Sequence, residues 1–317
     1  MLGDSTTIPA PTPTRDQSTL EVVFALHDSD GRYWLNTAVA VASVLRHASR
    51  PIRVSVIHNE TLSDEAVRRL TQLFSGTQHA LRLISIKLPD SLRRSSFGKF
   101  SIASIYRLSI PQVFDDQSVV LYLDSDLVAC GFDVLSILNY ELPESSISGV
   151  VDSFIGAHES DLTRLELLDL EPSKYINSGV LLIRPKLIKQ DLLGALEAFE
   201  ERFGRSAHRD QDFINYHFRN EIIFLEDRFN FQLSSHRRTM FLPLDQYAGK
   251  ILHYAGKVKP LDMRLAPGIL PFWQYTTDIP EIFKCHAHSS FTYLYPIDGD
   301  DRQVIAKPVV PGMKTNR

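Results

Sequence analysis

The feature of this chain that most restricts its fold is an alternation of short apolar runs with amphipathic segments over its first ninety residues. Three apolar runs have the length and composition of buried strands: 21–26, 52–58 and 81–87. The intervening residues 34–45 and 63–74 carry apolar side chains at helical spacing, and Ser63 stands at an N-cap position. Strand and helix in this order predict right-handed crossovers and a largely parallel sheet.

The rest of the chain extends the same pattern. Helices are expected at 101–113 and 192–203, and further strands at 119–123, 146–152 and 178–184. The fold class is therefore α/β, with a single Rossmann-like sheet, mixed or mostly parallel, flanked by helices. We expect a disordered Thr-, Pro- and Ser-rich arm at 1–18, one folded domain at 19–290 and a loose tail at 291–317.

Composition excludes several classes of protein. The formal net charge of −4 lacks the basic excess of a nucleic-acid-binding protein. Two cysteines, Cys130 and Cys285, do not make a disulfide framework and favour a reducing compartment. The N-terminal residues lack the apolar core of a signal peptide, and no window is long enough to span a bilayer. We expect a cytoplasmic protein without a transmembrane segment; contact with the inner face of a membrane stays open.

Two carboxylates, Asp124 and Asp126, directly follow the apolar run 119–123. Residues i and i+2 of an extended chain point to the same side, so the pair can face one point at the sheet edge where ligands bind. Because like charges repel, such a pair favours a hard divalent cation, and these ions commonly bridge to phosphates. The alternatives are a turn with solvated or helix-capping aspartates, or a haloacid-dehalogenase-like phosphoryl-transfer site.

Seven stretches, one of which contains this pair, decide between these interpretations: "VVFALHDS", "SIYRLSIP", "LYLDSDLV", "YINSGVLLI", "DQDFIN", "RFNF" and "LHYAGKVKP". Their content and order resemble glycosyltransferase family 8, which includes the lipooligosaccharide galactosyltransferase, lipopolysaccharide glucosyltransferases and glycogenin. The resemblance covers roughly residues 20–284. It implies a GT-A type nucleotide-diphospho-sugar transferase fold and makes 19–290 a glycosyltransferase catalytic domain.

The resemblance also implies a metal site. Asp124 and Asp126 match the metal-binding D-x-D of the family, and His253 matches the third ligand. Two carboxylates and an imidazole suit Mn²⁺, or Mg²⁺. Gly256 and Lys259 match positions that approach and neutralise the diphosphate of the donor.

The remaining matches concern the sugar nucleotide. Arg107 matches an arginine that contacts the donor, and "FALHDS" resembles the segment that holds uracil and ribose. The corresponding substrate-binding residues are Ala25, His27, Asp28, Ser29, Tyr33 and Ser125. His27 stands where the galactosyltransferase has an aspartate, which leaves the roles of Asp28 and Ser29 less defined, and Tyr33 could equally belong to the core.

Four residues resemble the sugar-binding and reaction-centre positions of the family. Asp152 and Asn177 match residues that bind the sugar, and Asp210 and Gln211 match the reaction centre. The alternative for Asp210, and for Asp212 in the same stretch, is a cap of the helix ahead of Phe213. Because an amide is a poor nucleophile, Gln211 favours attack on the same face from which UDP departs.

The predicted activity is retaining transfer of glucose or galactose from UDP-glucose or UDP-galactose to a hydroxyl of a glycan, glycolipid or glycoprotein, with lipopolysaccharide core as one candidate acceptor. Trp273 and Tyr275 could stack on a sugar or pack in the core. The alternatives are phosphoryl transfer by the same aspartates and a catalytically silent protein that binds a nucleotide sugar.

Overall fold

The computed structural model describes residues 19–93, 102–139, 145–206, 208–234, 237–256, 259–262, 266–277 and 279. The expected arm at 1–18, the domain limit at 290 and the tail at 291–317 lie outside these residues, as does Cys285.

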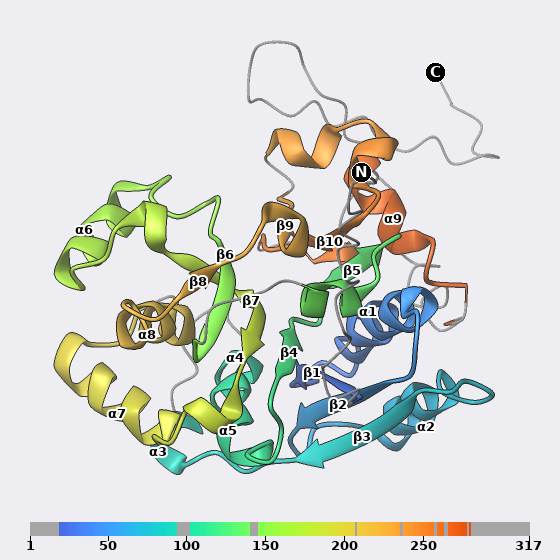
Figure 1. The fold of residues 1–317 in the computed structure, drawn as a ribbon, viewed down its shortest axis with the longest axis horizontal. Coiled ribbons are helices and arrows are strands. Elements are labelled where there is room, and N and C mark those ends of the chain that lie inside the picture. The colour runs from blue at the N-terminus through green and yellow to red at the C-terminus, as the bar shows by residue number, and fades with distance from the viewer. Residues whose placement is uncertain are drawn as a thin grey trace, which may run out of the picture.

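The main sheet has seven strands in the order β3-β2-β1-β4-β7-β6-β8. Their bounds are β1 Leu20–Leu26, β2 Ile52–His58, β3 Ala80–Ser85, β4 Val120–Leu123, β6 Ile147–Val151, β7 Ile176–Ile183 and β8 Ile223–Phe224. Strands β1 to β4 run parallel, whereas β7 is antiparallel to both β4 and β6. The predicted mixed, mostly parallel sheet is confirmed, with β4 at its centre (Figure 1).

Helices cover both faces of this sheet because the side chains of each inner strand alternate between two apolar clusters. Along β1, Val22 and Phe24 belong to one cluster and Val23 and Ala25 to the other. The first cluster includes α1 (Trp34–His47) and α2 (Asp64–Gln72), and the second includes α7 (Leu192–Phe203) and α8 (Arg209–His217). In Figure 1 the two pairs lie on opposite sides of β4. The remaining helices are α3 (Asp90–Arg93), α4 (Ala103–Tyr106), α5 (Ile110–Val113), α6 (Glu159–Leu167) and α9 (Leu270–Trp273).

Local signals set several of these elements. The Ser63 side chain accepts a hydrogen bond from the Ala66 amide at 3.2 Å and so caps α2, as predicted. The expected helix at 101–113 is instead interrupted: α4 and α5 flank a 3₁₀ turn at Arg107–Ser109. Pro111 lies in the first turn of α5, where its missing N–H costs little. Arg107, the first residue of that turn, is 4% exposed and contacts Asp124 just after β4, so it does not lie on a helix surface.

A second sheet, which the sequence did not predict, joins distant segments of the chain. Strand β10 (Lys250–His253) lies between β5 (Leu127–Cys130) and β9 (Phe231–Gln232). In its antiparallel register with β5, His253 pairs with Leu127. A strand of four residues and one of two carry too little periodicity to identify alone. This pairing brings His253, the last residue of β10, close to the end of β4.

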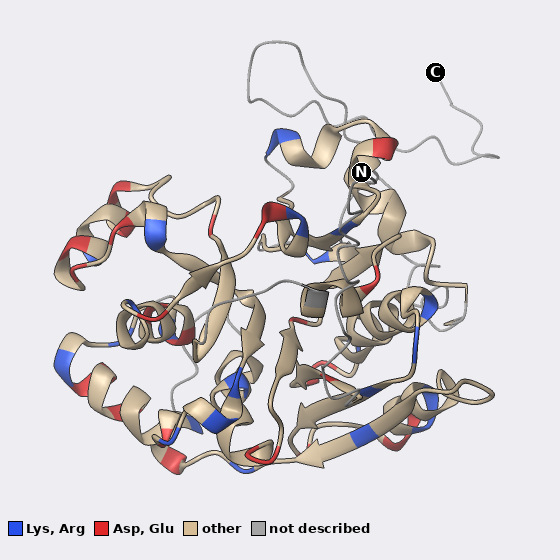
Figure 2. Ribbon diagram, in the orientation of Figure 1, with Lys and Arg blue, Asp and Glu red and all other residues tan. Residues whose placement is uncertain are grey.

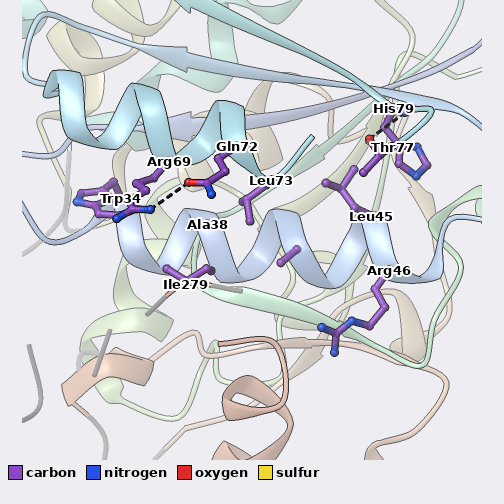
Figure 3. A pocket seen from close by; sticks show the side chains of 11 residues that line it. Trp34, Ala38, Leu45, Arg46, Arg69, Gln72, Leu73, Thr77, His79 and Ile279 are labelled. Carbon is purple, nitrogen blue, oxygen red and sulfur yellow. Dashed lines mark hydrogen bonds between the residues drawn. The ribbon is translucent and has the colours of Figure 1, made fainter. Parts of the chain in front are cut away.

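Two further features lie away from that point. A cavity of about 450 Å³ is lined by residues of both α1 and α2, and its lining includes Ala38, Leu45, Leu73 and Ile279 (Figure 3).

The charged residues lie mainly outside the central strands. Figure 2 shows acidic and basic residues interspersed on the outer helices, while β7 carries neither. Among the described residues, no helix has both the length and the apolarity needed to cross a membrane.

Candidate metal centre and its surroundings

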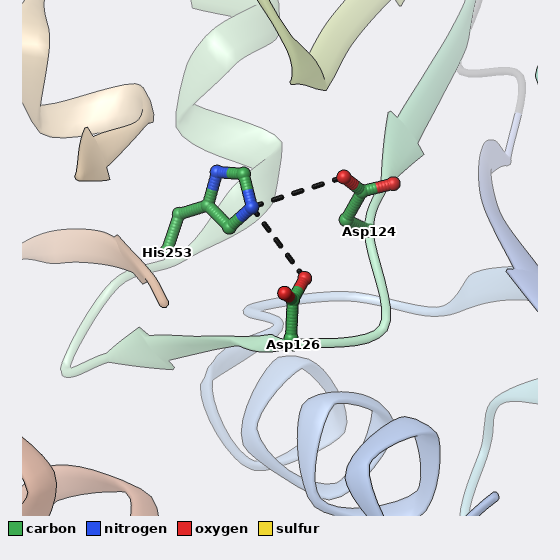
Figure 4. A group of neighbouring side chains, drawn as sticks. All are labelled: Asp124, Asp126 and His253. Atoms are coloured by element: carbon green, nitrogen blue, oxygen red, sulfur yellow. Dashed lines mark ion pairs between the residues drawn. The ribbon is translucent and has the colours of Figure 1, made fainter. Parts of the chain in front are cut away.

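Asp124, Asp126 and His253 converge at the carboxyl end of β4 (Figure 4). One ligand atom of each lies within 4.8 Å of the others. The His253 Nε2 is 3.4 Å from Asp126 Oδ1 and 3.8 Å from Asp124 Oδ2. Backbone bonds fix the loop, because the Asp124 amide donates to Gly179 O at 2.8 Å and the Tyr254 amide donates to Asp126 O at 2.9 Å. The two sheets therefore hold the three side chains from both sides.

This geometry suits a single small cation. Ligand atoms lie about 2.0–2.3 Å from ions such as Mg²⁺ or Zn²⁺, so neighbours about 3–4 Å apart can share one ion. Two carboxylate oxygens and one imidazole nitrogen form a mixed set that suits divalent metals of intermediate softness. Asp126 and His253 are 3% exposed, whereas the Asp124 side chain is 24% exposed. The group is thus buried on one side and open to a ligand on the other.

Arg107 and Tyr122 hold Asp124 in place. The Tyr122 hydroxyl donates to Asp124 Oδ1 at 2.6 Å, and Arg107 Nη2 donates to the same oxygen at 2.8 Å. The guanidinium also lies over the Tyr122 ring, 4.6 Å from its centre. Burial alone would lower the pKa of Arg107. The negative charge of Asp124 acts in the opposite direction, and the pKa is raised overall, so the arginine stays charged. Both bonds use Oδ1, which leaves Oδ2 facing His253.

Asp126 is held by Lys259. The lysine Nζ donates to Asp126 Oδ2 and lies 3.4 Å from Tyr254 O. Burial alone would raise the pKa of Asp126, but the Lys259 ammonium and His253 hold that pKa well below its ordinary value. The carboxylate is consequently ionised at neutral pH. Lys259 and Asp126 are 133 residues apart in sequence, so their contact depends on the tertiary fold.

A glycine makes room for the imidazole. A Cβ at position 179 would lie 2.1 Å from His253 Cε1 and 2.7 Å from Nδ1. Such distances are far inside van der Waals contact, so the ring can occupy its place only against a glycine. Gly179 belongs to the "YINSG" stretch on β7, next to the strand that carries Asp124.

A chain of buried side chains links Asp152, Asn177 and Gln211. Asp152 Oδ2 accepts hydrogen bonds from Asn177 Nδ2 at 3.0 Å and from Gln211 Nε2 at 2.9 Å. Its Oδ1 accepts the backbone amides of Phe154 and Ile155 at 2.7 and 3.0 Å. The Asp152 carboxylate therefore has four donors within the protein.

Asp210 joins this group to Arg107. The Arg107 Nε lies 3.4 Å from Asp210 Oδ2, which also accepts the Ser178 hydroxyl at 3.2 Å. The Ser178 amide donates to Gln211 Oε1 at 3.0 Å. Asp210 lies in the first turn of α8, where His208 is the N-cap residue, so Asp210 is not the helix cap. The alternative of a capping role at the N-cap position is wrong.

The residues after β1 lie beside the same edge. Tyr33 is partly buried, and burial together with the charges of Asp126 and Asp124 raises the pKa of its phenol. Asp28 is 3% exposed; its Oδ1 accepts the Tyr33 and Trp34 amides at 2.7 and 3.2 Å at the start of α1. Its Oδ2 has no hydrogen-bond partner among the described residues. Burial raises the pKa of Asp28.

Other predicted residues are more peripheral. The Ser125 hydroxyl donates to Ala25 O at 3.0 Å, which ties the D-x-D loop to β1. His27 Nδ1 is 3.3 Å from Asn59 Oδ1, and Ser29 is exposed. A Cβ at Gly256 would lie 3.2 Å from the Ser234 hydroxyl.

Tyr275 is a core residue rather than an exposed stacking platform: it is 2% exposed, and its hydroxyl donates to Ala129 O at 3.1 Å. Trp273 is partly buried and packs against the same core.

Three residues of the site were not predicted from the sequence: Tyr122, Gly179 and Asn230. Asn230 is 1% exposed, with Oδ1 2.9 Å from His253 Nδ1. All three lie within stretches already identified, "LYLDSD", "YINSG" and "RFNF". The period of two along a strand could have found Tyr122, two residues before Asp124.

Comparisons with known proteins bear on the family and the fold of the chain. A sequence model described as Glycosyl transferase family 8 matches residues 24–262. Glycosyltransferase GlyE of Streptococcus pneumoniae serotype 4 (strain ATCC BAA-334 / TIGR4) is 26% identical over 280 residues, which cover 80% of this chain. The matched residues make up 60% of GlyE, so the chain spans about three fifths of that relative's length.

Solved structures share the fold. Galactosyltransferase LgtC, in complex with donor and acceptor sugar analogs, has a TM-score of 0.69 at 24% identity and covers 84% of this chain and 99% of its own. The apo structure of the bifunctional glycosyltransferase WbbM has a TM-score of 0.66 at 22% identity and covers 87% of this chain and 53% of its own. These likenesses confirm the predicted GT-A type fold.

Proposed function

Since this chain belongs to glycosyltransferase family 8, we propose that it transfers glucose or galactose from a UDP-sugar to a hydroxyl of a glycan acceptor, with retention of anomeric configuration. The observation that carries the proposal is the convergence of Asp124, Asp126 and His253 beside Lys259 at the carboxyl edge of the sheet. Parallel α/β sheets bind ligands at this edge.

Asp124, Asp126 and His253 would hold the metal, with Mn²⁺ favoured over Mg²⁺ because of the imidazole ligand. A divalent ion bound there would supply charge stabilisation to the diphosphate as the glycosidic bond breaks. Lys259 would leave Asp126 for a phosphate oxygen, since its flexible stem lets the ammonium reach either partner. Gly256, without a side chain, would let the backbone approach the diphosphate.

The end of β1 would receive the nucleoside. Asp28 Oδ2 is a buried acceptor with no hydrogen-bond partner among the described residues. An N–H group of the base or a hydroxyl of the ribose would donate to it. His27, Ser29, Ala25 and Ser125 would contribute to the same nucleoside site; Ala25, His27 and Ser29 lie within three residues of Asp28, and Ser125 donates to Ala25 O.

The sugar would lie between the metal and the group formed by Asp152, Asn177, Asp210 and Gln211. Both ends of the Gln211 amide are engaged by protein partners, Ser178 and Asp152. The amide is thus held as an orienting group and is a poor nucleophile. We therefore propose that the acceptor hydroxyl attacks the face from which UDP leaves and gives its proton to the departing phosphate oxygen. Arg107 and Asp210 would hold the reaction centre in place.

The test is release of UDP from UDP-glucose and UDP-galactose with Mn²⁺ present, with and without oligosaccharide acceptors. We expect slow metal-dependent hydrolysis that an acceptor accelerates and that EDTA abolishes. A protein that binds UDP tightly but releases none from either sugar, with any acceptor, would be a silent binding protein and would contradict the proposal. A phosphoryl-transfer enzyme would release inorganic phosphate instead.

A further inference from the structure

The orientation of the His253 ring depends on an asparagine outside the proposed ligand set. His253 Nε2 faces both aspartates, while Nδ1 lies 2.9 Å from Asn230 Oδ1. A neutral imidazole can ligate a metal through Nε2 only if the proton sits on Nδ1. The question is therefore what places the proton on Nδ1. Side-chain amides are ambiguous by 180°, so the answer must come from groups whose role is fixed.

Two such groups fix the amide of Asn177. The backbone N–H of Gly179 can only donate, and it points at Asn177 Oδ1 at 3.0 Å. The Asp152 carboxylate, which already takes three other donors, can only accept, and Asn177 Nδ2 donates to it at 3.0 Å. Turning the amide over would set two donors against each other and two acceptors against each other. Asn177 therefore has one orientation, with its oxygen toward Asn230.

That orientation passes to Asn230 and then to His253. Because Asn177 presents an oxygen, Asn230 must present its Nδ2, which donates at 2.9 Å. The Asn230 oxygen consequently faces His253 Nδ1, and an oxygen there requires an N–H opposite. The lone pair is left on Nε2, which faces Asp124 and Asp126. Asn177 and Asn230 are 7% and 1% exposed, so water competes little for these hydrogen bonds.

We propose that Asn230 is a positioning residue that sets the tautomer of His253 and thereby prepares Nε2 to bind the metal. The inference deepens the proposed function and rests on it for the identity of the ligand. Partners of this kind typically account for about 10- to 100-fold in metal affinity. The asparagine holds the unbound ring in the ligating tautomer, so metal binding requires no proton rearrangement.

The first test uses the metal-free protein. Histidine labelled with ¹⁵N distinguishes an Nδ1–H from an Nε2–H ring by the chemical shifts of its two nitrogens, and His253→Gln assigns the signal. At a pH where the ring is neutral, wild type should show the Nδ1–H tautomer. Asn230→Leu should lose that preference, and Asn230→Asp, which keeps an acceptor, should retain it. An Nε2–H ring in wild type would overturn the proposal.

The second test measures Mn²⁺ affinity by electron paramagnetic resonance without any sugar nucleotide. Asn230→Leu should bind about 10- to 100-fold more weakly, and Asn230→Asp should bind more tightly than Asn230→Leu. Gln232→Leu is the matched control, because this buried amide lies in β9 but bonds to Val151 and Ser153 rather than to His253.

These outcomes separate the two proposals. Asn230→Leu with wild-type affinity would overturn the role of Asn230 while leaving the metal site intact. Wild type without measurable Mn²⁺ affinity would overturn the metal site, and the ¹⁵N spectrum would still decide the tautomer. Circular dichroism of each variant shows whether the fold survives, and the Gln232→Leu variant gives the effect of losing a buried side-chain amide two residues away, in β9.

Discussion

Two buried acidic groups in this protein show how a structural cluster differs from one prepared for a ligand. In the first, Asp212 is fully buried and accepts hydrogen bonds from Tyr175 at 2.6 Å, from Arg164 and from Ser206. Both of its oxygens are engaged. In the second, Asp124 and Asp126 place one oxygen each on protein partners and turn the other toward His253 at 3.8 and 3.4 Å.

The difference lies in what each carboxylate has left to bind. The Asp212 cluster is complete, because both oxygens of Asp212 have partners within the protein and Arg164 also pairs with Asp161. The second cluster keeps two oxygens and one nitrogen directed at a common point, with Asp124 partly exposed. Residue type alone does not separate the two clusters, because Asp212 belongs to the same "DQDFIN" stretch as Asp210 and Gln211. The two clusters differ in how many of their carboxylate oxygens already have a hydrogen-bond donor within the protein.

The largest effect on folding is expected for Asp212→Asn. Removing the charge of the fully buried Asp212 leaves Arg164 with Asp161 as its remaining carboxylate partner and should lower the free energy of unfolding by at most about 3–5 kcal/mol, with Mn²⁺ affinity unchanged. Urea denaturation measures the loss. Asp161→Asn is the control, because Asp161 pairs with the same arginine at 3.3 Å from a more exposed position. Equal losses for the two variants would contradict the comparison.

Asp126→Asn should act on function instead. Losing one metal ligand should reduce UDP release by about 100- to 1,000-fold, as for removal of other electrostatic groups that act on the leaving group. The thermal midpoint should fall less than for Asp212→Asn, because the partner left behind, Lys259, is 30% exposed and stays hydrated, and calorimetry checks this. Asp116→Asn, at an exposed aspartate in the turn before β4 and away from the metal centre, is the control for charge alone. Full activity of Asp126→Asn would remove the distinction between the clusters.

Gly179→Ala tests whether the ligating geometry depends on close packing. The new methyl group would displace the His253 ring, so we expect a loss of about 1–3 kcal/mol from overpacking together with weaker Mn²⁺ binding. Gly194→Ala in α7 is the control: there the added methyl meets the Asp191 carboxylate, 2.9 Å away, which is the end of a flexible side chain. Unchanged Mn²⁺ affinity in Gly179→Ala would show that the ring has another position.

The smallest effect is expected at Asp28. Burial raises the pKa of Asp28 above its ordinary value of 3.8, so its ionised form disfavours folding. The contribution of Asp28 to stability therefore falls as pH rises through the raised pKa. Asp28→Asn removes this dependence, and its stability relative to wild type should increase between pH 3 and pH 7. Parallel denaturation curves at both pH values check the sign, and a constant difference would contradict it.

Much of this architecture follows from sequence pattern. The alternation around 21–87 predicted β1, α1, β2, α2 and β3, because each is long enough to show a period. The second sheet could not be predicted, since β9 and β10 are too short to show a period and β10 pairs with β5, a strand more than a hundred residues away. The interrupted helix around Arg107 also depends on tertiary contacts.

The candidate site divides in the same way. Asp124, Asp126, His253 and Lys259 could be selected from the sequence because each stands in a recognisable stretch, and the structure brings them together. Asn230 and Gly179 could not, because their importance lies in what they contact. An asparagine or a glycine has no distinctive chemistry until the ring of His253 is placed against it.

The most direct test of the account is a crystal structure of the protein with Mn²⁺ and UDP, measured at the manganese absorption edge. The account predicts one anomalous peak that contacts Asp124, Asp126 and His253 Nε2, with the diphosphate on its open side and Lys259 moved from Asp126 to a phosphate oxygen. An anomalous peak elsewhere, or a UDP diphosphate bound away from this edge of the sheet, would contradict it.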